Sequence, residues 1–457
     1  MEGLEISVVK LSEVKGEFRI EAEHYQHKYQ KLLERLNKDF SYLKDLVSKP
    51  IQTGHTPSMK DSRFYGGNIK FVKTDNLREN EIKEPFSNYL SNLGNSEIKR
   101  TELQEEDIIT TIIGATYDVI ARSCIVQKSL LPANINQNIA HIRPDKKKIN
   151  PEYLNVYLNS KYGKMYLEYL SRQMEQVNLN CEEVGMVKVP IFSDTFQSKI
   201  ESLVKSAHAK LEESKSLYSQ AEDLLLGELG LKDWQPKNTL HTTKKFSDFA
   251  QSGRLDAEYY QQKYDEIEKA IKSYKGGYDI VSNLFNQNLD VCDYKKTEYN
   301  YVEIGDVNVG DGSVSFNKVD TSELPDNAKR VLHKNDILIS KVRPYRGAVA
   351  IIDFEQEDLI GSGAFTVLQE KSSYKKETLQ ILFRTAVYKD WLLKWNVGSS
   401  YPVIKDEDIL NLPIPILPEA IQTKITSLIQ QSFECKAQSK QLLEDAKRMV
   451  ESEIEKN

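Results

Sequence analysis

The chain repeats part of itself at about half of its length. The segment KLSEVKGEFRIEAEHYQHKY at residues 10–29 returns in altered form as KFSDFAQSGRLDAEYYQQKY at residues 245–264. A repeat at this spacing predicts that the protein is built from two versions of one unit, and two similar units predict two similar binding events. The residues that recur at a constant offset of 235 are Lys10, Ser12, Arg19, Ala22, Glu23, Tyr25, Gln26, Lys28 and Tyr29, which return as Lys245, Ser247, Arg254, Ala257, Glu258, Tyr260, Gln261, Lys263 and Tyr264.

Composition limits the class of protein further. With 39% hydrophobic and 28% charged residues among 457, each half can bury its own core and stay charged on its surface. No apolar run reaches the ~18 residues of a membrane span. The N-terminus is too acidic for a signal peptide, so we expect a cytoplasmic protein without membrane contact. The net charge of −6 argues against strong autonomous binding to a polyanion. Nucleic-acid binding would depend on local basic loops or on a partner that supplies part of the phosphate contact.

Both halves show the same order of predicted elements, which indicates an α+β fold. A helix around residues 21–36 opens the first half, and in each half β-like runs precede a helix and a proline-containing exit strand. In the first half the predicted strands cover residues 69–74, 107–113 and 139–144, the helix 152–170 and the exit strand 187–192; in the second half the strands cover 299–304, 336–342 and 364–369, the helix 377–395 and the exit strand 409–417.

A long polar helix is predicted to close each half. Its stripe residues recur in steps of four and three, which is the heptad signal of a coiled coil. The stripe is narrow and includes Ser and Lys, so we expect the two helices to pack against each other; two unrelated surface helices are the alternative. About 30 residues at ~1.5 Å each would make a spacer of roughly 45 Å. The stripes consist of Ile200, Val204, Ala207, Leu211, Ser214, Tyr218, Ala221 and Leu225, and of Ile425, Ile429, Ser432, Lys436, Ser439, Leu443, Ala446 and Val450.

These patterns divide the chain into domains and long helices. Gly230 and Pro236 end the first long helix and begin a polar linker. The predicted segments are a first domain at residues 1–193, a long helix at 194–229, a linker at 230–245, a second domain at 246–417 and a second long helix at 418–457.

Motifs for catalysis are missing from the sequence. There is no Walker A loop, no strand followed by GxGxxG, no NPPY- or DPPY-like tetrapeptide, no HExxH and no HxE with CxxC. Pro-Asp pairs occur at Asp145 and Asp326, but the Glu-x-Lys sequences at Glu81 and Glu97 precede both of them, which disfavours a metal-dependent nuclease. The four cysteines and seven histidines do not cluster, so we expect residues such as His141 to be packing or surface residues rather than ligands.

Several polar, basic and aromatic loops remain as candidates for binding. The loop at 53–73, TGHTPSMKDSRFYGGNIKFVK, combines basic side chains with small residues that allow close backbone approach. The segment KVRPYR at 341–346 carries three basic residues and no acid, and Arg suits bidentate contact with guanine. Asn and Gln suit contact with adenine, which draws attention to PANINQN at 132–138 with Asn134 and to the polar loop GSSYP at 398–402. An ordinary solvated turn is the alternative for each loop.

The chain resembles the specificity (S) subunits of type I restriction–modification systems. TGHTPSMKDSRFYGGNIKFVKTDNL is similar to the opening of that family's target-recognition domains, and EEDIITT and NDILISKVRP are similar to its D-I-L turn. NQNIAHIRP is similar to its NQ-x-I strand, and VPIF and LPIPIL lead into long helices as in the family. The second half departs from this pattern, because NQNLDVCDYKKTEYNYVEIGDV at 286–307 replaces the TPS…YGG loop.

The resemblance implies a non-catalytic subunit that recognises DNA. Two target-recognition domains would each read one half of a bipartite, asymmetric site on double-stranded DNA, and the long helices would pair antiparallel as a spacer in a pseudo-twofold arrangement. Two adenine methyltransferase subunits would dock on the chain and restriction–translocase subunits could join them; S-adenosylmethionine and ATP would belong to those partners. A self-sufficient endonuclease or methyltransferase, and a coiled-coil adaptor without a DNA role, are the alternatives. The side chains that we expect to contact DNA are Thr56, Ser58, Lys60, Arg63, Tyr65, Lys73, Asn136, Gln137, Lys295, Lys296, Lys341, Arg343, Tyr345, Arg346, Ser399, Ser400 and Tyr401.

Overall fold

The computed structural model describes two compact units. Unit 1 is formed by the chain up to Lys210 together with Ala437–Asn457, and unit 2 by Leu211–Lys436. Residues 1–21 apart from Val8, and Asn457, lie outside the described residues, so the N-terminal copy of the repeat is described only from Ala22 onward. Between Ala22 and Lys456 the residues that are not described are Pro85, Ala115, Tyr117, Asp118, residues 174–176, Asn238, Leu240, Ser399 and Ser400.

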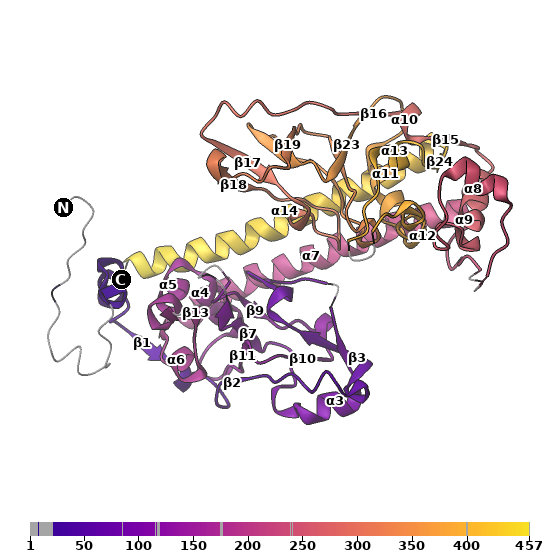
Figure 1. Cartoon of the computed structure of the whole chain (residues 1–457). Coiled ribbons are helices and arrows are strands. Elements are labelled where there is room, and N and C mark those ends of the chain that lie inside the picture. Colours follow the sequence, from indigo (N-terminus) through magenta and orange to yellow (C-terminus); the bar gives the residue numbers. More distant parts are fainter. Residues whose placement is uncertain are drawn as a thin grey trace. The chain divides into compact units, whose positions relative to one another are not determined.

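Two sheets carry the loops of unit 1 (Figure 1). Their strands are β2 (Gln52–Thr53), β3 (Tyr65–Val72), β6 (Tyr89–Leu90), β7 (Ile108–Thr111), β9 (Ser123–Ile125), β10 (Ala133–Ile135) and β11 (Ile139–Ile142). The first sheet has the order β2-β11-β7-β9 with antiparallel pairs, and the second has the order β10-β3-β6 with β10 parallel to β3. The Ile-Ile-Thr-Thr run of β7 favours a strand because branched side chains fit a pleated surface, and all four residues are buried.

Unit 2 repeats this topology. Its strands are β16 (Phe285–Gln287), β17 (Glu298–Val302), β18 (Asn317–Asp320), β19 (Ala328–Val331), β20 (Ile337–Ser340), β21 (Val349–Ile351), β22 (Leu359–Ser362) and β23 (Phe365–Glu370). The order β16-β23-β20-β21 matches the first sheet of unit 1. In the other sheet, β18-β17-β22-β19, the pair β17 and β22 is parallel, like β3 and β10. The sequence repeat is therefore a repeat of fold, and the predicted α+β class is confirmed.

A layer of two helices in each unit differs from the single helix that the periodicity predicts. In unit 1 it consists of α4 (Pro151–Asn159) and α5 (Lys161–Leu170), and in unit 2 of α11 (Lys376–Arg384) and α12 (Ala386–Trp391). Ser160 and Thr385 have extended backbones, and each side-chain hydroxyl accepts a hydrogen bond from the N–H three residues later. Each residue is thus the N-cap of a second helix, a role that Ser and Thr favour and that apolar periodicity does not reveal.

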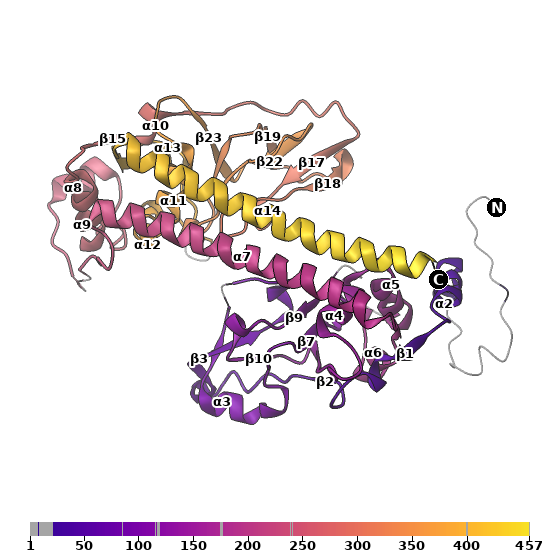
Figure 2. The same cartoon turned by 180° about the vertical axis from the view of Figure 1, so that it is seen from behind.

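The two long helices that the heptads predict are α7 (Asp194–Leu229) and α14 (Glu419–Lys456). In unit 1, Ile200 of α7 shares one core with Val450 of α14, so the first turns of α7 pack on the last turns of α14. In unit 2, Leu225 shares a core with Ile425, and this pairing is also antiparallel. Figures 1 and 2 show the two helices side by side within each unit. At ~1.5 Å per residue, the 36 residues of α7 span about 54 Å.

Shorter elements complete both units. Each unit has a small antiparallel pair next to its long helices, formed by β1 with β14 in unit 1 and by β15 with β24 in unit 2. The bounds are α2 (His27–Arg35), β1 (Phe40–Tyr42), β4 (Leu77–Arg78), β5 (Glu81–Ile82), α3 (Asn92–Glu97), β8 (Ile113–Gly114), β12 (Arg172–Gln173), β13 (Val177–Asn178), α6 (Cys181–Gly185), β14 (Lys188–Pro190), α8 (Phe246–Ser252), α9 (Gln262–Lys272), β15 (Tyr278–Ile280), α10 (Val281–Leu284), α13 (Asp406–Leu410) and β24 (Pro413–Pro415).

Candidate nucleic-acid interface

Residues 54–63 and 135–138 of unit 1 form one continuous surface, here named loop cluster 1. A Cβ on Gly54 would lie 2.0 Å from the carbonyl oxygen of Ile135, so only glycine lets these two backbones meet. The Thr56 hydroxyl donates a hydrogen bond to Oε1 of Gln137 at 2.5 Å. The cluster therefore joins the loop between β2 and β3 to the turn between β10 and β11.

The tip of loop cluster 1 exposes several of the predicted contact residues. Ser58, Lys60 and Arg63 are exposed, and the Arg63 side chain is 75% exposed. Arg63 forms an ion pair with Asp61 at 2.7 Å, and hydrogen bonds between the two raise the pKa of Arg63 and lower that of Asp61. Because water screens an exposed pair strongly, a phosphate or a base edge can compete with Asp61 for the guanidinium.

Other predicted contacts of unit 1 are already held by the protein. The Tyr65 hydroxyl donates to the carbonyl oxygen of Pro57 at 2.6 Å, and the Lys73 ammonium donates to Oδ1 of Asn88. Asn136 is buried, and its Oδ1 accepts a hydrogen bond from the N–H of Asn138 at 3.2 Å. These contacts hold the shape of the loops, and the direct DNA contacts of these side chains stay a prediction. Asn134, also buried, donates to Oδ1 of Asn95 at 2.8 Å.

Residues 341–347 and the described part of 397–403 in unit 2 form loop cluster 2. The guanidinium of Arg343 stacks on the ring of Tyr401, 4.4 Å from the ring centroid, and the Arg343 N–H donates to the carbonyl oxygen of Pro402 at 2.7 Å. Arg343 has φ = 50°, an uncommon conformation for a non-glycine residue that turns the chain sharply. Tyr345 and Arg346 are exposed beside it.

The other predicted contacts of unit 2 are spread out. Lys341 is half-buried and pairs with Asp406 at 3.0 Å, so it ties loop cluster 2 to α13. Lys295 and Lys296 precede β17, in a different sheet from β20, and form exposed pairs of 2.7 Å with Asp293 and 2.6 Å with Asp358. No recorded contact joins these two lysines to loop cluster 2 among the described residues. Ser399 and Ser400 lie outside the described residues.

A buried charge network joins β7 to β11, the strand that follows residues 135–138 of loop cluster 1. Asp107, at the start of β7, accepts from Nε2 of His141 at 2.7 Å and from Nε and Nη2 of Arg143 at 2.7 Å each, and it also accepts from the N–H of Gln104 at 2.7 Å. Burial raises the pKa of Asp107, but the hydrogen bonds from Arg143 and His141 outweigh burial and hold it below its usual range. In unit 2 the matching Asp336 is bound instead by neutral amides, including Asn288 at 3.0 Å. The aspartate of the D-I-L motif is therefore buried in both units, and its hydrogen bonds hold the turn before the strand in place.

His141 makes the stability of unit 1 depend on pH. Burial and the nearby charges of Lys49 and Arg143 together lower the pKa of His141, although Asp107 acts to raise it. Its Nδ1 has no hydrogen-bond partner among the described residues, so a proton there would be a buried, unsatisfied donor. The unfolded chain therefore takes up the proton first, near the ordinary His pKa of about 6.5. Asp107 behaves as a stabilising carboxylate, whose contribution is complete above about pH 4 and is lost on further acidification.

We expect the His141 contribution to be visible in a matched pair of proteins. As the pH falls from about 7 to about 5, the free energy of unfolding of the wild type should decline more than that of His141→Gln, which has no titrating imidazole. Urea unfolding followed by circular dichroism across this range measures the difference. A wild-type-minus-variant difference that does not change with pH would contradict this assignment.

Arg384, at the end of α11, supports loop cluster 2. Its side chain is buried and donates to the carbonyl oxygens of Gly347 and Val309, each at 3.0 Å, and to the hydroxyl of Tyr218 on α7 at 2.5 Å. Gly347 directly follows the Arg343–Arg346 turn and has φ = 72°. One guanidinium thus connects the base of the turn to the neighbouring loop and to the long helix.

Sequence reasoning did not single out Arg384 or the valines beside Tyr401. Val397 and Val403 bridge each other and are 60% and 39% exposed, so loop cluster 2 presents apolar as well as basic groups. In the sequence, this apolar surface is indicated by the two valines on either side of GSSYP. For Arg384 the signal was the lack of an acidic residue three or four positions away, directly after the apolar run Ile381–Phe383, since a lone cation there needs carbonyl partners.

The described residues hold no group of three or more His, Cys, Asp or Glu side chains arranged for a metal ion. Within the same residues, no helix combines the length and the apolar character that crossing a membrane requires.

Comparisons with known proteins point to one family. Residues 278–448 match the family model described as type I restriction modification DNA specificity domain. A curated relative, the type I restriction enzyme EcoBI specificity subunit of Escherichia coli, is 26% identical over 141 residues, which are 31% of this chain and 29% of the relative. This match thus spans less than a third of the relative's length. Both findings confirm the resemblance that the motifs predict.

Similar solved structures extend over most of the chain. The S subunit of a type I restriction-modification system from M. genitalium has 11% identity and a TM-score of 0.41, with 91% of this chain and 94% of that chain covered. The HsdS subunit from Thermoanaerobacter tengcongensis has 14% identity and a TM-score of 0.29, with 91% and 95% covered. The family model falls on the half that lacks the TPS…YGG loop, so the framework rather than that loop carries the match.

Proposed function

We propose that this chain is the non-catalytic DNA-recognition and scaffold subunit of a type I restriction–modification complex. Loop cluster 1 and loop cluster 2 each read one half of a bipartite, asymmetric site on double-stranded DNA. The observation that carries this proposal is a repeated framework with unlike loops. Sheet order, helix pair and long helix recur in both units, whereas matching loops differ in sequence: residues 54–63 follow β2, and residues 288–297 follow the matching strand β16. One framework with two different surfaces fits two half-sites of different sequence.

The repeat also supports two like partners. In the second copy Phe246 and Leu255 are 83% and 81% exposed, and the first copy has Leu11 and Ile20 at the same places, outside the described residues. Apolar residues at matching positions of the two copies, exposed in the second copy, suit two copies of one protein partner. We assign this role to two adenine methyltransferase subunits, which restriction–translocase subunits can join. S-adenosylmethionine and ATP then belong to those partners, and the complex works in the cytoplasm.

Single substitutions in the two clusters test the proposal. Arg63→Ala should relax base discrimination in one half of the target and Arg343→Ala in the other, because each arginine lies in a different unit. A good arginine contact to a base contributes about 1–3 kcal/mol, so the preference for the correct base should fall about 5- to 150-fold. Methylation sequencing of cells that carry each variant with its methyltransferase partner gives the result for each half-site. Lys232→Ala, which changes an exposed lysine outside both clusters, is the matched control.

The alternatives predict different results. A coiled-coil adaptor without a DNA role predicts unchanged methylation sites and rates in both variants while the complex still assembles. A self-sufficient enzyme predicts turnover when the purified chain alone is given DNA, metal and S-adenosylmethionine. A continuous target without a gap would also contradict two separate reading surfaces.

A further inference from the structure

A short hairpin in unit 1 links the strand that follows loop cluster 1 to the helices. It is formed by β4 and β5, and its two-residue tip is Glu79 and Asn80, with Asn80 at φ = 57°. Four residues separate the hairpin from β3, the strand that carries Tyr65 and follows Arg63. The position of the tip and the position of β3 are therefore linked by a short stretch of chain.

Asn80 fixes the tip to the body of its own unit. Its N–H donates to the carbonyl oxygen of Ser123 at 3.2 Å, and its Oδ1 accepts from the side-chain amides of Asn155 at 2.8 Å and Asn159 at 2.9 Å. Asn159 also donates to the carbonyl oxygen of Ser123 at 2.9 Å. The tip is thus held against β9 and α4 by hydrogen bonds between uncharged groups.

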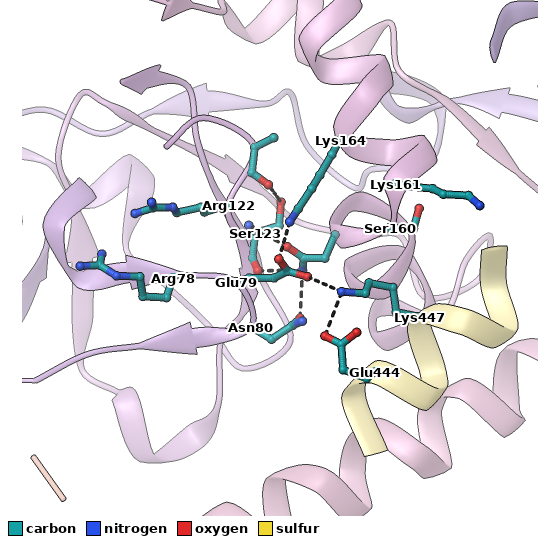
Figure 3. Close-up of polar contacts among 12 residues, drawn as sticks. Arg78, Glu79, Asn80, Arg122, Ser123, Ser160, Lys161, Lys164, Glu444 and Lys447 are labelled. Atoms are coloured by element: carbon teal, nitrogen blue, oxygen red, sulfur yellow. Dashed lines mark hydrogen bonds and ion pairs between the residues drawn. The ribbon is translucent and has the colours of Figure 1, made fainter. Parts of the chain in front are cut away.

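Glu79 adds a charged link to the long helix. Figure 3 shows its carboxylate between two ammonium groups, those of Lys164 on α5 and Lys447 on α14. The distance to Lys447 is 3.1 Å, and Lys447 also contacts Glu444 of its own helix at 2.9 Å. Burial raises the pKa of Glu79, but its pairs with Lys164 and Lys447 outweigh burial, so its pKa lies below the usual range and the group is ionised at neutral pH.

Unit 2 contains a corresponding ion pair between a carboxylate and α14, formed by different residues. Asp311 lies in the loop that follows β17, as Glu79 follows β3, and it forms an ion pair with Lys436 of α14. Lys436 also donates to the hydroxyl of Ser313 at 2.7 Å, and Asp311 accepts from the N–H of Ser313 at 2.9 Å. In each unit, a carboxylate after the corresponding strand pairs with a lysine of α14.

We propose that Glu79 and Asp311 are positioning residues for sequence recognition. Each holds the reading loops of its own unit in a defined place on the segment of α14 that belongs to that unit. Base readout needs side chains placed within about 0.5 Å, so a tether between the recognition framework and the helix affects discrimination although it touches no base. This inference rests on the proposed function.

Charge reversal and charge exchange test the link in unit 1. Glu79→Lys places three ammonium groups together, and Lys447→Glu places three carboxylates together, so each should lower base discrimination about ten-fold. The loss should fall on the half-site that Arg63→Ala changes and should leave the other half-site intact. The double variant Glu79→Lys with Lys447→Glu restores opposite charges across the contact and should regain most of the loss. Asp311→Asn should act on the half-site that Arg343→Ala changes.

Asp445→Lys is the control, because Asp445 lies on the same turn of α14 but pairs with Arg448 of its own helix rather than with Glu79, Lys164 or Lys447. It should leave discrimination at both half-sites unchanged. The readout is methylation sequencing for each half-site, with the melting temperature of the assembled complex measured in parallel.

Equal losses at both half-sites, or no recovery in the double variant, would overturn the inference. If Glu79→Lys has no effect while Arg63→Ala does, the inference fails alone; if neither arginine variant has an effect, the proposed function fails and takes the inference with it.

Discussion

Asp107→Ala is expected to lower the free energy of unfolding of unit 1 by about 3–5 kcal/mol. The Asp107 side chain is 2% exposed, and it is the charged partner of Arg143 and the hydrogen-bond acceptor for His141. Removing the carboxylate leaves the imidazole of His141, which is fully buried, and the guanidinium of Arg143, which is 22% exposed, without this acceptor. Breaking one side of a buried ionic network costs far more than losing a surface pair, because the remaining charge stays buried.

The chain offers a way to assign this loss to one unit. All three tryptophans, Trp234, Trp391 and Trp395, belong to unit 2. Tryptophan fluorescence therefore reports unfolding of unit 2, whereas circular dichroism reports both units. In urea, Asp107→Ala should move the circular-dichroism transition and leave the fluorescence transition in place. The control Glu106→Ala removes a partner of the exposed Lys146 and should change stability by less than about 0.5 kcal/mol. A small effect of Asp107→Ala would show that its network adds little to the fold.

Arg384→Met is expected to destabilise unit 2 by about 3 kcal/mol and to impair the half-site read by loop cluster 2. Methionine keeps most of the apolar volume but cannot donate hydrogen bonds. The carbonyl oxygens of Gly347 and Val309 then lose their charged donor, at about 1–3 kcal/mol for each buried group left unsatisfied. Because Gly347 ends the turn that carries Arg343, the turn should also lose its fixed orientation.

Two measurements check the Arg384 prediction. The tryptophan fluorescence transition in urea should shift to lower urea concentration. Methylation sequencing at a temperature where the variant is folded should show weaker discrimination at the half-site that Arg343→Ala changes. Arg330→Met is the matched control, because Arg330 donates a single hydrogen bond of 2.7 Å to the carbonyl oxygen of Leu289 in an exposed place. Equal shifts for the two variants would contradict a special role of the buried guanidinium.

Local patterns predicted much of the fold. The heptad stripes identified α7 and α14, and the stripe residues Ile200 and Ile425 are fully buried in the cores that pair these helices. The β-branched runs identified β7 and β20 in the two matching sheets. These features depend on side-chain periodicity, which a sequence displays directly. The same periodicity did not reveal the helix breaks at Ser160 and Thr385. A polar residue within a helical pattern becomes a cap only when the backbone turns there, and periodicity does not show that turn.

The candidate interface was less predictable from sequence. The exposed residues Arg63 and Arg346 lie where the loop composition placed them. Composition could not tell these exposed groups from Asn136, which is buried, or from Lys73, whose ammonium is bound to Asn88. A polar side chain faces solvent or ties two loops together depending on which segments meet in the fold. Contacts between residues that are far apart in the sequence determine which segments meet.

The sequence by itself determined that this protein has two similar halves, each with an α+β framework and a long helix, because repeats and periodicity are written in the order of residues. Only the tertiary structure decided which charges anchor that framework. The local sequence around Asp107, Arg384 and Glu79 does not name their partners, because each meets partners 34 or more positions away. Burial and distance set the strength of an ionic contact, and both are properties of the folded chain.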